Sequence, residues 1–186
     1  MSTEPTAPAP APAPQPAPEP KKQSIGKRIL LYVVGLVVAA VAIYGFNYFT
    51  SDAAQTKAGD CATVKGTTSS PDYKSAGCDS ADANYVVGKA LSSLSESCGS
   101  DGYVEYTESA RRGPKTKLCL VPRLAEGKCY DFDNTTSMEW PAIDCGKSGA
   151  AKVVKVVKDA EPDCGEANAY AFTAPKIAYC VAPGDA

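Results

Sequence analysis

The chain has 186 residues, of which 22% are charged, and its formal net charge is −2. Residues 51–186 carry more acidic than basic side chains, which excludes the basic surface that a nucleic-acid partner requires. Histidine is absent, so the commonest general base and metal ligand is unavailable to any chemistry that this chain performs.

Residues 1–28 form a low-complexity segment in which proline alternates mostly with alanine from Pro5 to Pro20. Proline fixes φ and lacks an amide donor, so the segment favours neither helix nor sheet. We expect a disordered, extended tail that acts as a solvated spacer, rather than a docking strip for a proline-binding partner. Its last eight residues contain four cations: Lys21, Lys22, Lys27 and Arg28.

Residues 29–50, ILLYVVGLVVAAVAIYGFNYFT, contain no charged side chain. A helix of this length spans a hydrocarbon core of about 30 Å, so the segment predicts a transmembrane helix and the lipid bilayer as a partner. The run is too long for the core of a cleaved signal peptide, which predicts an uncleaved signal-anchor. The preceding cations place the N-terminus in the cytoplasm and residues 51–186 outside the plasma membrane.

All eight cysteines follow the span, and their spacing repeats. Cys61, Cys78, Cys98 and Cys119 are followed, at offsets of 68, 67, 66 and 61, by Cys129, Cys145, Cys164 and Cys180. Their neighbours repeat too, since Gly59-Asp60-Cys61 matches Gly127-Lys128-Cys129. We therefore predict a linker at 51–58 and two tandem copies of one module, at 59–124 and 125–186.

Each copy is predicted to be mainly β. Strand patterns in the first copy fall at 60–65, 73–78, 84–90, 103–108 and 116–121, and in the second at 128–132, 139–145, 151–158, 168–173 and 176–182. Residues 90–98 (ALSSLSESC) have helical spacing, and a turn or short helix is expected near 160–167. The predicted fold is a transmembrane helix followed by two small β-β-β-α-β-β modules of the α+β class, each with two disulfides.

The cysteines are predicted to form structural disulfides, because modules this small bury little apolar surface. Zinc and thioredoxin-like redox centres favour closely paired ligands such as C-x-x-C, and this chain has none. If the first two strands of a copy form a hairpin, the start of one faces the end of the other, and the last two strands behave likewise. The expected bridges are Cys61–Cys78, Cys98–Cys119, Cys129–Cys145 and Cys164–Cys180.

Few residues outside the cysteines are candidates for a functional site. Arg111 and Arg112 have the charge to bind an anionic glycan or lipid headgroup, but the sequence favours a charged hairpin tip at this position. Residues 131–134 (DFDN) resemble the opening of a calcium loop but lack its glycine and closing glutamate, so a solvated turn is expected. We predict no catalytic residue, metal site or cofactor, and no enzyme activity.

Residues 59–122 resemble the LppU-type proteins of actinobacteria. The similarity lies in the pattern GDC … PDYK … CDSADANYVV … C … YTESARRG … LCLVP, and residues 125–186 resemble a divergent second unit. That family is similar in turn to extracytoplasmic cysteine-containing modules of septum-formation-related proteins. The resemblance implies a cell-envelope protein of unassigned activity. This chain lacks the lipobox cysteine of lipoprotein members, so its predicted anchor is the span.

The sequence favours a single-pass envelope protein whose duplicated, disulfide-stapled external part acts as an interaction or scaffolding module with other envelope proteins. The alternative is an extracytoplasmic sensor that binds a small ligand or cell-wall fragment in a groove between the copies. A junction pocket lined by tyrosines would favour the alternative.

Overall fold

The computed structural model describes residues 25–99 and 102–184. The predicted proline-rich tail, including Lys21 and Lys22, therefore lies outside the described residues, apart from its last four residues. The chain divides into two compact units, residues 1–38 and 39–186.

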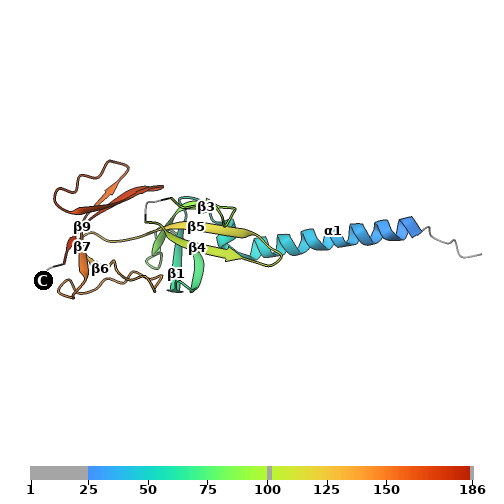
Figure 1. Cartoon of the computed structure of the whole chain (residues 1–186), viewed down its shortest axis with the longest axis horizontal. Coiled ribbons are helices and arrows are strands. Elements are labelled where there is room, and N and C mark those ends of the chain that lie inside the picture. Colours follow the sequence, from blue (N-terminus) through green and yellow to red (C-terminus); the bar gives the residue numbers. More distant parts are fainter. Residues whose placement is uncertain (1–24, 100–101, 185–186) are drawn as a thin grey trace, which may run out of the picture. The chain divides into compact units, whose positions relative to one another are not determined.

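Helix α1, Ile25–Thr50, contains the predicted span (Figure 1). Its 26 residues are long and apolar enough to cross a membrane, and none of them is buried. The helix begins four residues earlier than the predicted span, so Lys27 and Arg28 belong to it rather than to the tail. Both are good helix formers, which explains the extension.

Residues 51–58, predicted as a linker, are instead folded against the first sheet. Ser51 caps the short helix α2, Asp52–Gln55, by accepting a hydrogen bond from the amide of Ala54 at 3.0 Å. Ala53 is buried, and the hydroxyl of Thr56 lies 2.9 Å from that of Tyr73. A helix of four residues is too short to show an apolar periodicity, so composition alone indicated a linker.

The first sheet contains all five strands expected in the first copy. These are β1 Cys61–Thr67, β2 Ser70–Ala76, β3 Tyr85–Leu91, β4 Val104–Ser109 and β5 Lys115–Pro122. They pair antiparallel in the order β2-β1-β3-β5-β4. The β3–β5 ladder shifts register between Val87 and Lys89, as at a β-bulge.

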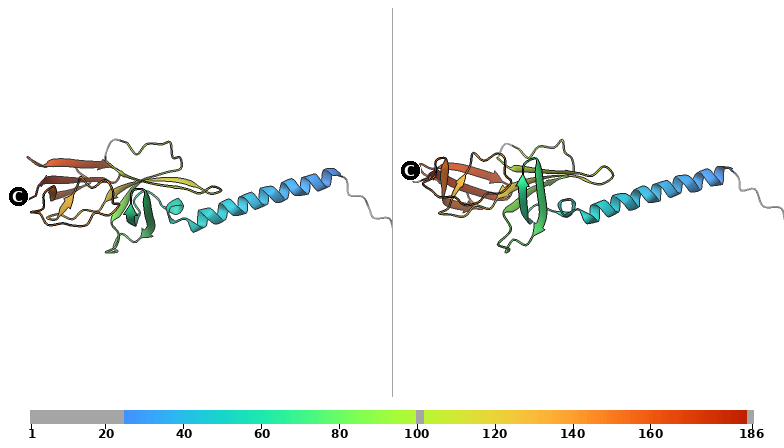
Figure 2. Two further views of the ribbon diagram at one scale, coloured as in Figure 1. Left: turned by 60° about the horizontal axis from the view of Figure 1, so that its bottom comes forward. Right: turned by 90° about the horizontal axis from the view of Figure 1, so that it is seen from below.

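The second sheet has the same order without a counterpart of β2. Its strands, coloured from orange to red, lie near the end of the chain marked C in Figure 2. Its strands are β6 Cys129–Asp131, β7 Ala150–Lys158, β8 Asn168–Thr173 and β9 Lys176–Pro183, paired antiparallel as β6-β7-β9-β8. The β7–β9 ladder shifts register between Val153 and Lys155, at the position that corresponds to the shift in the first sheet.

The strand predicted at 139–145 does not form. Only Ile143 makes an isolated bridge, to Cys129, which corresponds to the pair of Cys61 and Ala76 in the first sheet. The residues just before it cross to the first sheet, where the amide of Met138 donates to the carbonyl of Gly66 at 2.9 Å. Met138 is buried in the core of that sheet, so its side chain decides the path of this segment.

The helix predicted at 90–98 does not form either. Strand β3 continues to Leu91, and bends and turns follow. Serine side chains bond the local backbone here, since the hydroxyl of Ser97 accepts from the amide of Gly99 at 3.1 Å. Such bonds compete with helix formation, which is why the spacing of the leucines was misleading. Near 160–167 a turn is present, which is one of the two predicted alternatives.

Two hydrophobic clusters share one side chain. The first lies on the first sheet and contains Tyr85, Leu118 and Met138, and the second lies on the second sheet around Val153 and Tyr179. Trp140 packs against both clusters. The two sheets therefore form one continuous apolar interior rather than two separate domains.

Three tyrosine hydroxyls join the two parts of this interior. Tyr85 donates to the carbonyl of Met138 at 2.6 Å and accepts from the indole nitrogen of Trp140 at 3.0 Å. Tyr103 both donates to the carbonyl and accepts from the amide of Ala174, each at 2.9 Å. Tyr179 donates to the carbonyl of Pro122 at 2.6 Å. Each bond satisfies a polar group that the apolar junction would otherwise leave unpaired.

Gly88 lies at the bulge of β3, where Ala174, between β8 and β9, approaches the backbone closely. A Cβ atom at this position would overlap the carbonyl oxygen of Ala174. The corresponding bulge residue of the second sheet is Val154, whose side chain is 41% exposed. Only the bulge that faces the other sheet therefore requires glycine.

We predict that Gly88→Ala lowers the free energy of unfolding by about 1–3 kcal/mol, because the added methyl group forces the two sheets apart. Urea unfolding of the full chain in detergent, followed by the fluorescence of Trp140, measures this change. Val154→Thr, at the corresponding exposed bulge, should stay within about 0.5 kcal/mol of the wild type. Equal effects of the two substitutions would contradict the packing assigned to Gly88.

A second prediction concerns alkaline pH. Burial raises the pKa of Tyr85 to about 12, from an unperturbed value near 10. Above pH 10 the unfolded chain releases this proton while the folded chain retains it, so stability is fully present below pH 10 and falls as the pH rises towards 12. The expected loss is about 2–3 kcal/mol from this group.

Tyr85→Phe should remove that part of the alkaline loss, and at pH 7 it should cost about 1–3 kcal/mol because Met138 and Trp140 lose their partner. Urea midpoints from pH 8 to pH 11.5 provide the measurement. Tyr170→Phe, which changes an exposed ring on β8, is the control and should retain the wild-type slope. Identical alkaline slopes for Tyr85→Phe and the wild type would refute the assignment.

Candidate functional site

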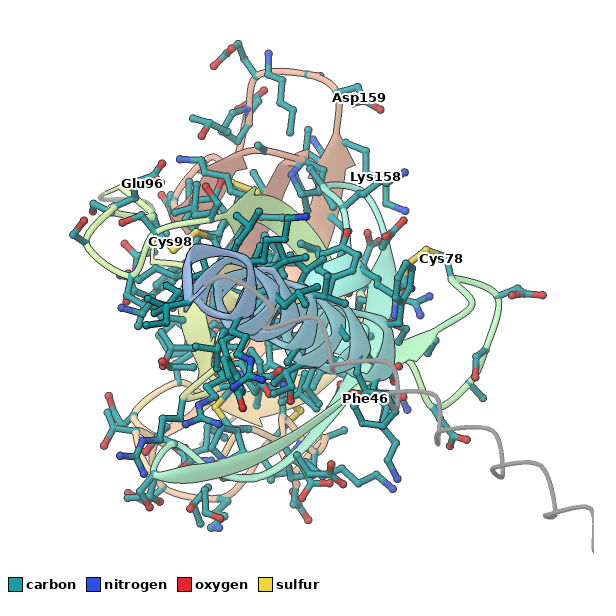
Figure 3. All side chains as sticks on the ribbon, turned by 90° about the vertical axis from the view of Figure 1, so that its right-hand side faces the viewer. Phe46, Cys78, Glu96, Cys98, Lys158 and Asp159 are labelled. Atoms are coloured by element: carbon teal, nitrogen blue, oxygen red, sulfur yellow. A yellow bond between two sulfur atoms is a disulfide. The ribbon has the colours of Figure 1, made fainter. Side chains whose placement is uncertain are left out.

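The eight cysteines form the four bridges that the hairpin argument predicts: Cys61–Cys78, Cys98–Cys119, Cys129–Cys145 and Cys164–Cys180. Each bridge ties a strand residue to a loop that carries little regular structure. Figure 3 shows Cys78 and Cys98 on opposite sides of the first sheet. Cys78 is exposed, whereas Cys98 is buried. The bridges therefore constrain separate loops rather than form a cluster.

A groove of about 470 Å³, which we call the junction groove, lies where the two sheets meet. Val86 of β3 contributes from the first sheet, and Val156 of β7 and Tyr179 of β9 contribute from the second. Leu124, in the connection between the sheets, is buried beside them. These side chains give the groove an apolar lining that neither sheet provides alone.

Two cations line the same groove, Arg123 and Lys158, and both side chains are exposed. Arg123 donates to the carbonyl of Ala83 at 2.9 Å, which holds the guanidinium beside the loop that precedes β3. Lys158 is the last residue of β7, next to Asp159 (Figure 3). A guanidinium held by a backbone hydrogen bond and an exposed ammonium, both beside an apolar lining, suit a ligand with both apolar and anionic groups.

Among the described residues that line this groove, Tyr179 is the single tyrosine. Burial is the largest cause that raises the pKa of its phenol above the usual value of 10, and its hydroxyl donates to Pro122. This hydroxyl is thus a neutral structural donor at physiological pH. The tyrosine-lined pocket that would favour a small-ligand sensor is therefore only partly realised.

The predicted arginine pair does not belong to the junction groove. Arg111 and Arg112 lie in the loop between β4 and β5, and both are exposed. The carbonyl of Arg112 accepts a hydrogen bond from the side-chain amide of Asn47 in α1, at 3.3 Å. The pair is therefore held beside the C-terminal end of the apolar helix. In Figure 1 this end of the β4–β5 hairpin lies away from the second sheet.

The calcium-like segment forms a turn that satisfies its own side chains. The carboxylate of Asp131 accepts from the amide of Asp133 at 3.1 Å, and the side chain of Asn134 accepts from the amides of Thr136 and Ser137. Within residues 25–99 and 102–184, no three histidine, cysteine, aspartate or glutamate side chains are grouped so that they could hold a metal ion. These oxygens shape the loop that leads to Met138.

The sequence suggested a groove between the copies only as part of the alternative function, and it did not identify the residues that line the groove, because they come from four separate segments. Arg123 follows the motif of Leu118–Pro122, and Lys158 ends a predicted strand, but nothing in their spacing indicates that they face one another. Within β7, the burial pattern shows no simple alternation after Val153. Only the placement of one sheet against the other assigns these two cations to one surface.

No protein-family model, no curated protein and no solved structure matches this chain.

Proposed function

We propose that this chain is a single-pass envelope protein, anchored by α1, whose external domain binds other envelope proteins without catalysing a reaction. In this proposal the N-terminus is cytoplasmic and residues 51–186 lie outside the plasma membrane. The cations that flank the span and the four disulfides support this orientation, since disulfides persist in oxidising compartments. The resemblance to LppU-type proteins supports the envelope assignment.

The proposal includes a tandem duplication of one module. Corresponding hydrogen bonds support it: the amide of Gly59 donates to Val87 at 2.8 Å, and that of Gly127 donates to Val153 at 2.7 Å. The matching strand orders and the matching register shifts support it as well. In this view the second copy lost the strand that corresponds to β2. The segment around Met138 that precedes the position of this strand now packs against the first sheet.

The junction groove is the observation on which the binding function rests. Both copies contribute to its lining, and the hydroxyls of Tyr85, Tyr103 and Tyr179 hold the copies in one arrangement. A binding surface that is already rigid avoids much of the entropic cost of association. Arg123 and Lys158 favour a partner segment that combines acidic and apolar side chains.

A second candidate function is the binding of a small anionic ligand, such as a cell-wall fragment, in the same groove. Its volume of about 470 Å³ lies within the range usual for small-molecule sites. The open, partly polar lining and its single tyrosine favour a protein segment instead. Binding of purified cell-wall fragments, measured by calorimetry with the wild type and with Lys158→Gln, distinguishes the two functions.

The proposed orientation predicts that reagents added to intact cells reach the cysteines of residues 51–186. A membrane-impermeant reductant should open the disulfides, and a membrane-impermeant maleimide should then label the thiols. Labelling should increase the mass of the protein only when both reagents are present, because all eight cysteines are paired. A cysteine introduced by Ser2→Cys is the matched control, and it should react only after the cells are opened. The reverse pattern would contradict the orientation.

The binding function predicts a partner at the junction groove. A photo-crosslinking amino acid at Ala125, which lines the groove, should give one reproducible protein adduct in cells, whereas the same residue at the exposed Ala142 should not. When Arg123→Gln and Lys158→Gln are combined with the crosslinker at Ala125, the yield of the adduct should fall several-fold, because the partner loses its contacts with the two cations.

Mass spectrometry of the adduct identifies the partner. The absence of a reproducible adduct from Ala125, in cells where the labelling experiment has established the orientation, would refute the groove as a protein-binding site. An adduct of equal yield from Ala142 would show that the crosslinks report proximity rather than binding.

A further inference from the structure

We propose that the loop Ala110–Pro114 is a phospholipid-binding loop, in which the guanidinium groups of Arg111 and Arg112 bind the phosphates of anionic phospholipids in the leaflet where α1 ends. This inference rests on the proposed function in one respect, because it requires α1 to span a membrane. It does not depend on which side of the membrane the external domain occupies.

The first step concerns the depth of Asn47. A helix rises about 1.5 Å per residue, so a hydrocarbon core of about 30 Å takes about 20 residues. Counted from Ile29, the first residue of the uncharged run, the core ends near Tyr48. Phe46 and Phe49 are 70% and 74% exposed on this part of the helix, as expected for aromatic side chains at a membrane interface.

The second step is that the loop between β4 and β5 is fastened at this depth. The side-chain amide of Asn47 donates to the carbonyl of Ile43 at 2.9 Å within the helix and to the carbonyl of Arg112 at 3.3 Å. A Cβ atom added to Gly113 would lie 2.8 Å from the Cβ of Asn47, so the glycine permits this close approach. The loop therefore lies at the level of the lipid headgroups.

A second contact keeps the same hairpin against the helix. The hydroxyl of Ser51 donates to the carboxylate of Glu108 at 2.5 Å, and the hydroxyl of Tyr106 donates to it at 3.2 Å. Glu108 is the acidic residue closest in sequence to the two arginines. Each of its carboxylate oxygens already accepts a hydrogen bond from one of these hydroxyls. The loop itself, from Ala110 to Pro114, contains two cations and no acidic side chain.

The third step concerns the chemistry of the two arginines. Both side chains are exposed, and neither has a carboxylate partner in the described part of the chain. By contrast, Lys117 on the adjacent strand is paired with Glu105 at 3.3 Å. A guanidinium binds phosphate through two parallel hydrogen bonds, and Arg side chains reach several ångströms along a membrane surface. Phosphate-bearing headgroups therefore supply the anionic partner that this loop lacks.

The test uses the full chain in lipid nanodiscs that contain phosphatidylcholine and a small amount of a spin-labelled lipid, labelled near the headgroup. The label is carried either by phosphatidylglycerol or by phosphatidylcholine. Nuclear magnetic resonance measures the broadening of the amide signals of residues 110–113. We expect broadening about threefold stronger with the anionic lipid, because it is enriched at the loop.

Arg111→Gln/Arg112→Gln should abolish this preference, whereas Lys128→Gln/Lys147→Gln should retain it. The control pair removes the same charge from two exposed positions of the second copy. Equal broadening by both lipids in the wild type, or a preference that survives in Arg111→Gln/Arg112→Gln, would overturn the proposal.

A label at the end of the acyl chain tests the anchor separately, through the amide signals of residues 37–40. Broadening of these signals without broadening of the loop overturns only the lipid-binding loop. No broadening at 37–40 would show that α1 does not span the bilayer, and would overturn the proposed anchor as well.

Discussion

The arrangement of the external domain depends on hydrogen bonds made by buried tyrosine hydroxyls across the junction of its sheets. Tyr85 is fully buried, and its hydroxyl joins Met138 and Trp140 to the first sheet. A tyrosine supplies a large apolar surface and one polar hydroxyl, so it is buried favourably only where this hydroxyl has a hydrogen-bond partner. The hydrogen bonds of Tyr85 help to hold residues 138–140 against the first sheet, and those of Tyr103 help to hold Ala174 near it.

Both disulfides and apolar packing stabilise the external domain. Each sheet alone is too small to bury a sufficient core, and four bridges constrain the loops that the sheets leave unsupported. Trp140 packs against both hydrophobic clusters, so loss of either sheet exposes the core of the other. We therefore expect the domain to unfold as one cooperative unit, although its sequence reads as two modules.

Two surfaces at different places follow from this construction. The junction groove exists because the connection at Arg123–Ala125 holds the sheets together, and the loop with Arg111 and Arg112 is positioned because Asn47 and Ser51 fasten the β4–β5 hairpin to the helix. The two surfaces share no residue. In the proposed function, the first surface binds the partner and the second fixes the height of the domain above the lipid.

The sequence by itself determined the apolar helix, nine of the ten strands and the cysteine pairs, because these depend on local composition, on alternation and on the geometry of neighbouring strands. It failed at residues 90–98, where serine side chains bond the backbone, and at 139–145, where burial of Met138 in the other sheet outweighs local strand pairing. Only the tertiary structure placed Arg123 and Lys158 in one groove and Arg112 in contact with Asn47. These residues are distant in the chain, and their placement depends on how whole elements pack, which no local pattern encodes.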